Sequence, residues 1–284
     1  MKKIGIVLEG GAMRSVFEAG ILDYFLEKEI IIPNVIAVSA GAYAGMNYVS
    51  RQKGRLIDAV IKPLEKVKYM GFGTFFRTGS FFDMDYLFDI VPKEQAPFDF
   101  DTFRNSPIRF MMSTTDCVTG ECVYHEDFKS QEHFWNLCKA ANSMPFISKI
   151  THLDGRVWLD GGVSDAIPVD KALEENFEKM IVVLTRKSDY RKKYRRFYMM
   201  MLRLVYRKYP ELIKIVEKRS DKYNESLDKL KQLEEEGKAF VIRPTKMAIK
   251  NQESDIATLM KYYEHGYEIA KEREGEIRKF LYEE

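Results

Sequence analysis

Short apolar runs alternate with longer helix-forming stretches through the first part of the chain, and this alternation limits the possible folds more than any other feature. The apolar runs include Ile4–Leu8, Val35–Val38 and Met180–Thr185, and segments such as Arg14–Glu29 show helical spacing. Apolar strands that are separated by helices form mostly parallel sheets with both faces covered. The sequence therefore predicts an α/β fold, a three-layer sandwich with a mostly parallel central sheet.

The distribution of charge divides the 284 residues into two parts. Residues 1–185 have a net charge of −5 and residues 186–284 have one of +7. The later part is mostly charged, helix-forming sequence. We therefore expect an α/β domain at residues 1–188 and a mainly helical C-terminal extension at residues 189–284.

Composition excludes several classes of protein. An apolar content of 45% and a charged content of 31% are typical of a folded globular chain, and a net charge of +2 gives no reason to expect nucleic acid. The uncharged stretch 30–50 is long enough to cross a bilayer, but Pro33, Gly41 and Gly45 interrupt it, so a strand, a turn and a buried helix are predicted instead. The N-terminal apolar run is too short for a signal peptide.

The three cysteines lack the spacing of metal ligands or of a disulfide framework, which favours a reducing compartment. We expect no metal and no cofactor. The expected location is the cytoplasm, with peripheral contact at the inner membrane face as the alternative that a basic segment described below allows.

The first apolar run ends in a glycine-rich loop, with Gly10, Gly11, Ala12 and Arg14 ahead of a helix. Small residues allow neighbouring backbone N–H groups to point inward, and the helix N-terminus adds the positive end of its dipole. Such a loop can bind a phosphate or stabilise an oxyanion, although an ordinary strand–helix turn has a similar sequence. The glycine spacing of a dinucleotide-binding loop is absent.

Ser39 follows the second apolar run, in the sequence Ala37-Val38-Ser39-Ala40-Gly41. Small residues two positions before and after the serine suit a sharp strand-to-helix turn that presents a nucleophile, with Ala37 at the position where glycine is usual. The alternative is that Ser39 is only the N-cap of the following helix.

Asp160 ends a third apolar run and precedes Gly161 and Gly162. An aspartate before glycine is common in turns, but here its carboxylate is expected near the carboxyl ends of the other strands. The order Ser39, Asp160, His265 would suit a hydrolase triad. The early position of the serine and the place of His265 in a charged C-terminal helix count against that triad, and a serine–aspartate dyad needs no histidine.

Taken in order, the loop from Gly10 to Arg14, the Ser39 turn and Asp160-Gly161-Gly162 resemble the patatin-like phospholipases, and the E-G-G-x-M-R opening is similar to their bacterial branch. The resemblance extends over roughly residues 4–185. It implies a catalytic domain at residues 1–188 that hydrolyses fatty-acyl esters of lipids through an acyl-enzyme. It also implies the roles of the residues: Ser39 as nucleophile, Asp160 as general base, and Gly10, Gly11, Ala12 and Arg14 as the oxyanion hole.

Three positions depart from the family pattern: Ala37, Ala12 and Ser15 stand where the family often has glycine. We expect an alanine at either of the first two sites to be tolerated if its φ is negative. Ester hydrolysis remains possible with these departures, and its rate is not predicted.

Two further segments are candidates for contact with lipid. Met70–Phe88 holds seven aromatic residues among three glycines, which suggests a mobile apolar lid or, alternatively, a satellite hydrophobic cluster. Arg186–Tyr209 contains ten Lys and Arg residues and one acid, with Phe197 and Leu204 at helical spacing. We expect a basic helix there that contacts an anionic membrane, or one that packs on the domain with its charged side in solvent.

We thus expect a serine lipid acyl hydrolase. Two alternatives remain open: a catalytically weak, membrane-associated scaffold with the same fold, and a soluble short-chain esterase or thioesterase. No nucleic acid partner is expected, because no groove-reading module accompanies the basic charges.

Overall fold

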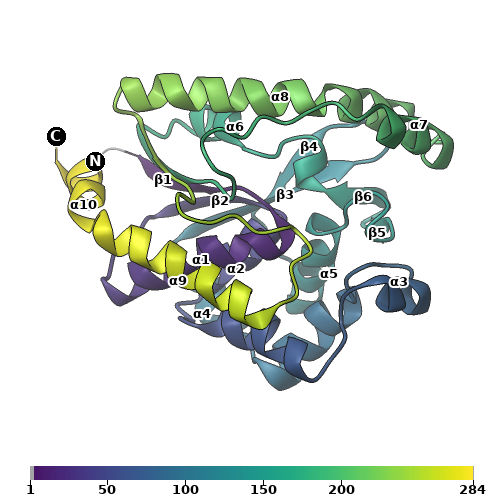
Figure 1. Cartoon of the computed structure of the whole chain (residues 1–284), viewed down its shortest axis with the longest axis horizontal. Coiled ribbons are helices and arrows are strands. Elements are labelled where there is room, and N and C mark those ends of the chain that lie inside the picture. Colours follow the sequence, from purple (N-terminus) through teal and green to yellow (C-terminus); the bar gives the residue numbers. More distant parts are fainter. Residues whose placement is uncertain (1–2, 284) are drawn as a thin grey trace.

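The computed structural model describes residues 3–283, and an eight-stranded sheet runs through their centre (Figure 1). The strand order is β5-β6-β3-β2-β1-β7-β8, and β4 pairs with β3 off this path. The parallel strands are β1 (Ile4–Leu8), β2 (Asn34–Val38), β3 (Arg109–Asp116), β7 (Lys179–Val183) and β8 (Ala239–Ile242). The antiparallel strands are β4 (Cys122–His125), β5 (Thr151–Leu153) and β6 (Arg156–Asp160).

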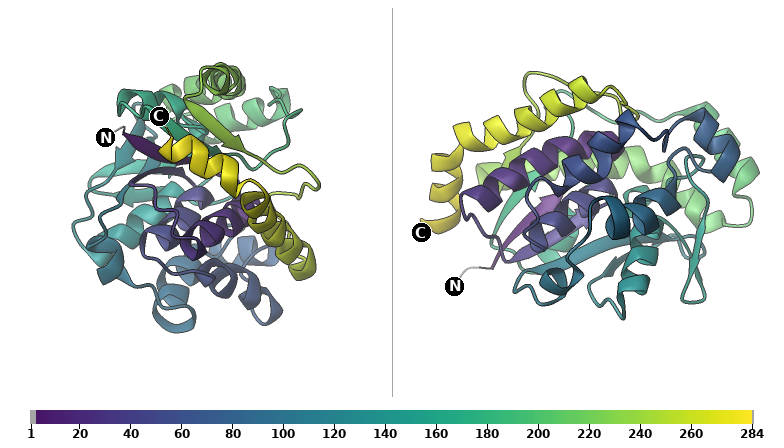
Figure 2. Two further views of the ribbon diagram at one scale, coloured as in Figure 1. Left: turned by 90° about the vertical axis from the view of Figure 1, so that its left-hand side faces the viewer. Right: turned by 90° about the horizontal axis from the view of Figure 1, so that it is seen from below.

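Helices cover both faces of the sheet, which confirms the predicted three-layer α/β sandwich (Figure 2). One face carries α1 (Val16–Glu27), α2 (Ala40–Val49), α5 (Gln131–Ala141) and α9 (Ile256–Glu272). The other face carries α6 (Val169–Glu174) and α8 (Pro210–Glu235). The remaining α-helices are α3 (Phe72–Thr78), α4 (Phe100–Arg104), α7 (Arg196–Val205) and α10 (Glu274–Tyr282).

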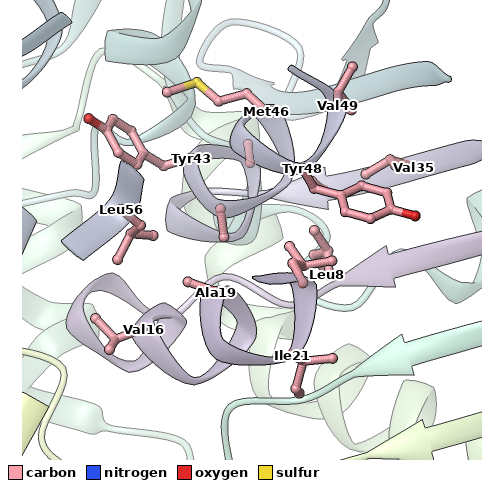
Figure 3. Packing of buried hydrophobic residues seen from close by; sticks show 14 of the residues in the cluster. Leu8, Val16, Ala19, Ile21, Val35, Tyr43, Met46, Tyr48, Val49 and Leu56 are labelled. Atoms are coloured by element: carbon pink, nitrogen blue, oxygen red, sulfur yellow. The ribbon is translucent and has the colours of Figure 1, made fainter. Parts of the chain in front are cut away.

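Alternate residues of each central strand point to opposite layers, as the pleat requires. Leu8 of β1 and Val35 of β2 join the core beneath α1 and α2, where Ile21 and Met46 lie close by (Figure 3). Val7 faces the opposite core beneath α6 and α8. Because both sides of these strands are buried, they appear in the sequence as continuous apolar runs.

The uncharged stretch 30–50 is divided between β2 and α2, as its proline and glycines predict. Within residues 3–283, no helix is both long enough and apolar enough to cross a membrane.

The C-terminal segment is mainly helical, as expected, and it also completes the central sheet. Strand β8 pairs with β7 in parallel, and α9 packs along α1 on the outside of the sheet (Figures 1 and 2). The boundary between residues 188 and 189 stays a prediction.

The contact between α1 and α9 depends on two glycines that face the partner helix. A Cβ atom on Gly20 would lie 2.1 Å from the carbonyl oxygen of Tyr263, and one on Gly266 would lie 2.1 Å from that of Phe17. No side chain fits in so short a distance, so the two helix backbones are in direct contact.

We therefore expect Gly266→Ala to lower the free energy of unfolding by about 1–3 kcal/mol, because the added methyl group forces α9 away from α1. Gly275→Ala in α10 is the matched control, since a Cβ there meets nothing within 4 Å. Helix propensity alone should make that variant more stable by up to about 1 kcal/mol. Denaturant unfolding of both variants measures the difference, and equal stabilities would contradict the close packing.

Candidate active site

Ser39 lies at the sharp turn between β2 and α2. Its backbone has φ of +55° and ψ of −132°, a region that non-glycine residues rarely adopt. Small neighbours permit the turn, because a Cβ on Gly10 would lie 2.5 Å from the Cβ of Ser39 and one on Gly41 would lie 3.0 Å from the carbonyl oxygen of Glu9. The backbone geometry is that of an elbow that exposes a nucleophile.

Asp160 is fully buried beside Ser39 and is held by two uncharged donors. The Ser39 hydroxyl donates to Oδ2 of Asp160 at 2.5 Å, and the backbone N–H of Gly162 donates to Oδ1 at 2.8 Å. The two residues are 121 positions apart in the chain. The serine and the carboxylate that the sequence singled out therefore lie in direct contact.

Asp160 lies at the end of an antiparallel strand, whereas a mostly parallel sheet suggests a parallel one. Strand β6 is antiparallel to β3, with Asp160 opposite Thr114, whereas β1 and β2 are parallel. Its carboxyl end therefore points back along β3 toward Ser113, the partner of Val38 in β2. An antiparallel strand thus delivers Asp160 to the same place as the parallel strand ends.

Burial raises the pKa of Asp160 to about 6, while the hydrogen bonds from Ser39 and Gly162 limit the rise. A carboxylate with that pKa is a stronger base than an exposed aspartate and is still mostly ionised at pH 7. The sequence could not decide whether burial has this effect, because it depends on long-range packing.

The glycine-rich loop passes directly beside Ser39. Among residues 3–283, the N–H groups of Gly10 and Gly11 donate no hydrogen bond, whereas Met13 donates to the carbonyl oxygen of Asn251 at 3.2 Å. Both glycines line the same cleft as Ser39. Two unpaired N–H groups next to a serine hydroxyl are the arrangement that an oxyanion hole requires.

Ala12 does not meet the condition set for it, since its φ is +49° rather than negative. A strained backbone conformation of this kind at a non-glycine residue costs about 1–3 kcal/mol. Ala37 lies inside β2, where extended backbone suits any residue. Gly161, next to the base, has no room for a side chain, because a Cβ there would lie 2.0 Å from Oγ of Ser113.

Glu9 also lies in the site, and no role was predicted for it from the sequence. Its buried carboxylate accepts hydrogen bonds from the N–H of Thr185 at 2.7 Å and from the hydroxyl of Tyr223 at 2.7 Å. It thereby joins the end of β1 to the end of β7 and to α8. The only local signal was a lone acid at the end of an apolar strand.

His265 is not part of the site. Its Nε2 atom accepts the backbone N–H groups of Thr245 at 3.1 Å and Lys246 at 3.3 Å, and its ring packs against Phe17. Because these contacts engage His265 away from the cleft that holds Ser39, the triad alternative is wrong.

A large cleft of about 1330 Å³ opens over Ser39 and Asp160. One wall comes from the face of the sheet covered by α2 and is apolar, with lining residues that run from Tyr43 to Phe88. Met144 and Phe146 also line the cleft, but they pack against the cluster of α7 and α8. The Met70–Phe88 segment supplies part of the apolar wall, including Phe82 and Phe88, and also forms α3. That this segment moves as a lid stays a prediction.

The opposite wall contains much of the basic segment, and here the expectation of one basic helix over Arg186–Tyr209 is wrong. Helix α7 begins only at Arg196, and residues 186–195 form an irregular segment, with a turn at 188–189, that contacts α8 and lines the cleft. Asn224 of α8 fixes this segment through hydrogen bonds with the backbone N–H and C=O of Lys192 at 2.9 and 3.0 Å.

The fold places the protein in the three-layer α/β class. Within that class it belongs to the patatin-like phospholipase family, whose model matches residues 6–173, more than half of the chain. This is a family of lipid hydrolases. A second model, described as a domain of unknown function (DUF6363), matches residues 209–282.

Two individual proteins are similar to this chain. The chain is 27% identical over 192 residues to the uncharacterized protein YjjU of Escherichia coli strain K12, in an alignment that covers 66% of this chain and 53% of YjjU. The chain thus spans about half the length of that relative. A solved structure, VipD from Legionella pneumophila, is similar with a TM-score of 0.46 and 12% identity, over 96% of this chain and 66% of VipD.

The raised pKa of Asp160 predicts a stability effect with a definite sign. The folded protein binds the Asp160 proton more tightly than the unfolded chain does, so this group favours folding below pH 4 and loses that contribution as pH rises through about 6. We expect Asp160→Asn to raise the free energy of unfolding by about 1–3 kcal/mol at pH 8 and by little at pH 4. The exposed Asp127→Asn is the control, and a pH-independent effect of Asp160→Asn would contradict the assignment.

Proposed function

We propose that this protein is a serine lipid acyl hydrolase in which Ser39 and Asp160 form the catalytic dyad. The observation that supports this most strongly is the 2.5 Å hydrogen bond from the Ser39 hydroxyl to the buried Asp160 carboxylate, inside the large cleft. Membership of a phospholipase family supports the choice of lipid esters as substrates.

The reaction proceeds by acyl transfer. Asp160 accepts the hydroxyl proton while Ser39 Oγ attacks the ester carbonyl carbon, and the N–H groups of Gly10 and Gly11 stabilise the resulting oxyanion. The proton then passes to the leaving alcohol. Asp160 next takes a proton from water as the water oxygen attacks the acyl-enzyme carbonyl carbon. Asp160 then returns this proton to Ser39 Oγ as the fatty acid leaves.

The apolar wall favours a long acyl chain over the short chains of a simple esterase or thioesterase. Aromatic and aliphatic side chains line it in succession, among them Tyr43, Tyr69, Phe82, Leu87 and Phe88. The apolar surface of such a wall stabilises each methylene that it removes from water by up to about 0.8 kcal/mol.

We expect Ser39→Ala and Asp160→Asn each to lower kcat/KM for a soluble ester by a factor of about 10³ or more, because each removes a group on which the chemical step depends. A fluorophosphonate probe should label the wild-type protein at Ser39, as peptide mapping can verify. Labelling elsewhere, or full activity in Ser39→Ala, would favour the scaffold alternative or another nucleophile.

Two controls accompany these variants. Ser220→Ala changes another buried serine that lines the cleft and should keep its activity. His265→Ala should keep activity per folded molecule, since His265 binds backbone N–H groups outside the cleft.

We further propose peripheral membrane contact at the end of the molecule where α3 and α7 lie (Figures 1 and 2). Large apolar side chains are exposed there, with Phe76 at 85%, Phe197 at 72% and Leu204 at 65%. The opposite side of α7 is packed, since Met199 and Leu202 are buried. Exposed aromatic side chains beside Lys and Arg are typical of surfaces that bind anionic lipid.

We expect the double variant Phe197→Ser, Leu204→Ser to bind anionic vesicles about tenfold more weakly or worse, because it removes the side chains that would enter the interface. Tyr282→Ser is the control, since Tyr282 is also exposed but lies in α10 at the opposite end (Figure 1). Vesicle sedimentation measures binding. Equal binding of both variants would contradict this surface, while hydrolysis of a soluble ester should not change in either.

A further inference from the structure

Four cationic side chains line the cleft close to the dyad: Arg14, Arg186, Lys192 and Arg219. They come from the glycine-rich loop, from the segment after β7 and from α8. The position of Arg219 relative to the dyad is fixed, because its Nε donates to the carbonyl oxygen of Gly162 at 2.7 Å. The N–H of the same glycine donates to Asp160.

These cations are held by uncharged groups. Nε of Arg14 lies 3.5 Å from Oγ1 of Thr185, the Arg186 guanidinium lies over the ring of Tyr190 at 4.2 Å, and Nζ of Lys192 lies 4.7 Å from the ring centre of Tyr223. The four make no ion pair within residues 3–283, where the nearby ion pairs belong to Arg191 with Asp228 and Lys222 with Asp165.

The acids that share the cleft do not balance this charge. Within residues 3–283, eight Lys and Arg residues line the cleft but only three acids, Glu9, Asp160 and Asp189. Glu9 is the carboxylate nearest the four cations, and its bonds to Thr185 and Tyr223 leave it with a single negative charge. Asp189 is exposed at the rim, and Asp160 is bonded to Ser39. The wall therefore keeps an excess of positive charge.

Burial and this excess of positive charge both act on Lys192. Burial lowers the pKa of its ammonium group well below the usual value, and the charges of Arg219, Arg14 and Arg186 lower it further, with Glu9 opposing them. A partly buried group of cations without counter-charges is unfavourable by itself and becomes favourable once an anion is bound.

We propose that Arg14, Arg186, Lys192 and Arg219 bind a phosphate group of the substrate, on the wall opposite the acyl chain. This inference rests on the proposed function, because it places the phosphate and the ester on one molecule, with Ser39 between the two walls. Phosphate suits the wall because several Arg and Lys side chains can share its oxygens.

The subsite gives the C-terminal part of the chain a role in recognition. Three of the four cations lie outside the match to the patatin-like phospholipase model at residues 6–173. Arg219 lies within the match to the domain of unknown function at residues 209–282.

The test compares soluble dihexanoyl esters that differ only in the headgroup: phosphatidic acid, phosphatidylcholine and the neutral diacylglycerol. We expect kcat/KM of the wild-type protein to be at least tenfold higher for phosphatidic acid than for the neutral ester. Lys192→Gln and Arg186→Gln should each lower kcat/KM for phosphatidic acid roughly tenfold, mainly by raising KM. Neither variant should change kcat/KM for the neutral ester.

Lys208→Gln is the matched control, because it removes a charge from the same basic segment at an exposed residue outside the cleft. Its activity should equal that of the wild-type protein on all three esters. Equal losses on charged and neutral esters in Lys192→Gln and Arg186→Gln, or no loss in either variant, would overturn the subsite.

A binding experiment on an inactive variant tests the subsite independently of catalysis. It also distinguishes binding of a lipid phosphate from binding of free phosphate. Calorimetry should detect binding of dihexanoyl phosphatidic acid to the Ser39→Ala variant. The double variant Ser39→Ala, Lys192→Gln should bind this lipid at least tenfold more weakly. Inorganic phosphate should bind Ser39→Ala far more weakly than the lipid does. Inorganic phosphate that binds as tightly as the lipid would overturn the assignment to substrate. Selective binding without hydrolysis of any ester by the wild-type protein would instead overturn the proposed function and support the subsite.

Discussion

The buried carboxylate of Asp160 is the group on which the geometry of the site depends. Its backbone is fixed on both sides, since its N–H donates to the carbonyl oxygen of Ser143 at 2.9 Å and its own carbonyl oxygen accepts the hydroxyl of Thr115 at 2.8 Å. The next residue, Gly161, lies against Ser113 with no room for a side chain. Strand β3 therefore sets the position of the carboxylate, and the hydroxyl of Ser39 comes within hydrogen-bond distance because β2 also pairs with β3. Displacement of either strand would separate the pair.

Much of this arrangement could be predicted from the sequence, because its signals are local. The apolar runs identify β1, β2 and β7, and the small residues around Ser39 identify a sharp turn whatever lies elsewhere in the chain. The direction of β6 relative to β3 could not be predicted, because a buried strand of five residues has the same apolar pattern whether it runs parallel or antiparallel to its neighbour. The start of α7 at Arg196 could not be predicted either, because Lys192, in the preceding segment, is held by Asn224, which lies 32 positions away in the chain. Long-range contacts of this kind also determine the pKa of Asp160 and the role of Glu9.

The C-terminal segment is part of the same structure as the site rather than an appendage. Tyr223 of α8 binds Glu9 at the end of β1, and Tyr262 of α9 donates to the carbonyl oxygen of Thr185 at 3.1 Å. These contacts meet at the edge of the sheet where the glycine-rich loop begins. A chain that ended after β7 would leave the carboxylate of Glu9 without one of its donors and would leave β7 as an edge strand. The segment after residue 185 thus stabilises the loop that lies beside Ser39.

Several features of the site oppose folding, and this explains why so much packing surrounds it. Ser39 at φ +55° and Ala12 at φ +49° each hold a backbone conformation that costs about 1–3 kcal/mol. The burial of Asp160 adds a cost of similar size above pH 6, as its raised pKa indicates. Such conformations persist only where neighbouring groups leave no alternative, and here Gly10 and Gly41 allow the loop and the end of β1 to approach the Ser39 turn closely. Since net stabilities of proteins are only about 5–15 kcal/mol, terms of this size must be offset by packing, and the contacts of α9 with α1 and of β8 with β7 contribute to it. The helices and strand farthest along the chain thus help to stabilise the strained turn near its beginning.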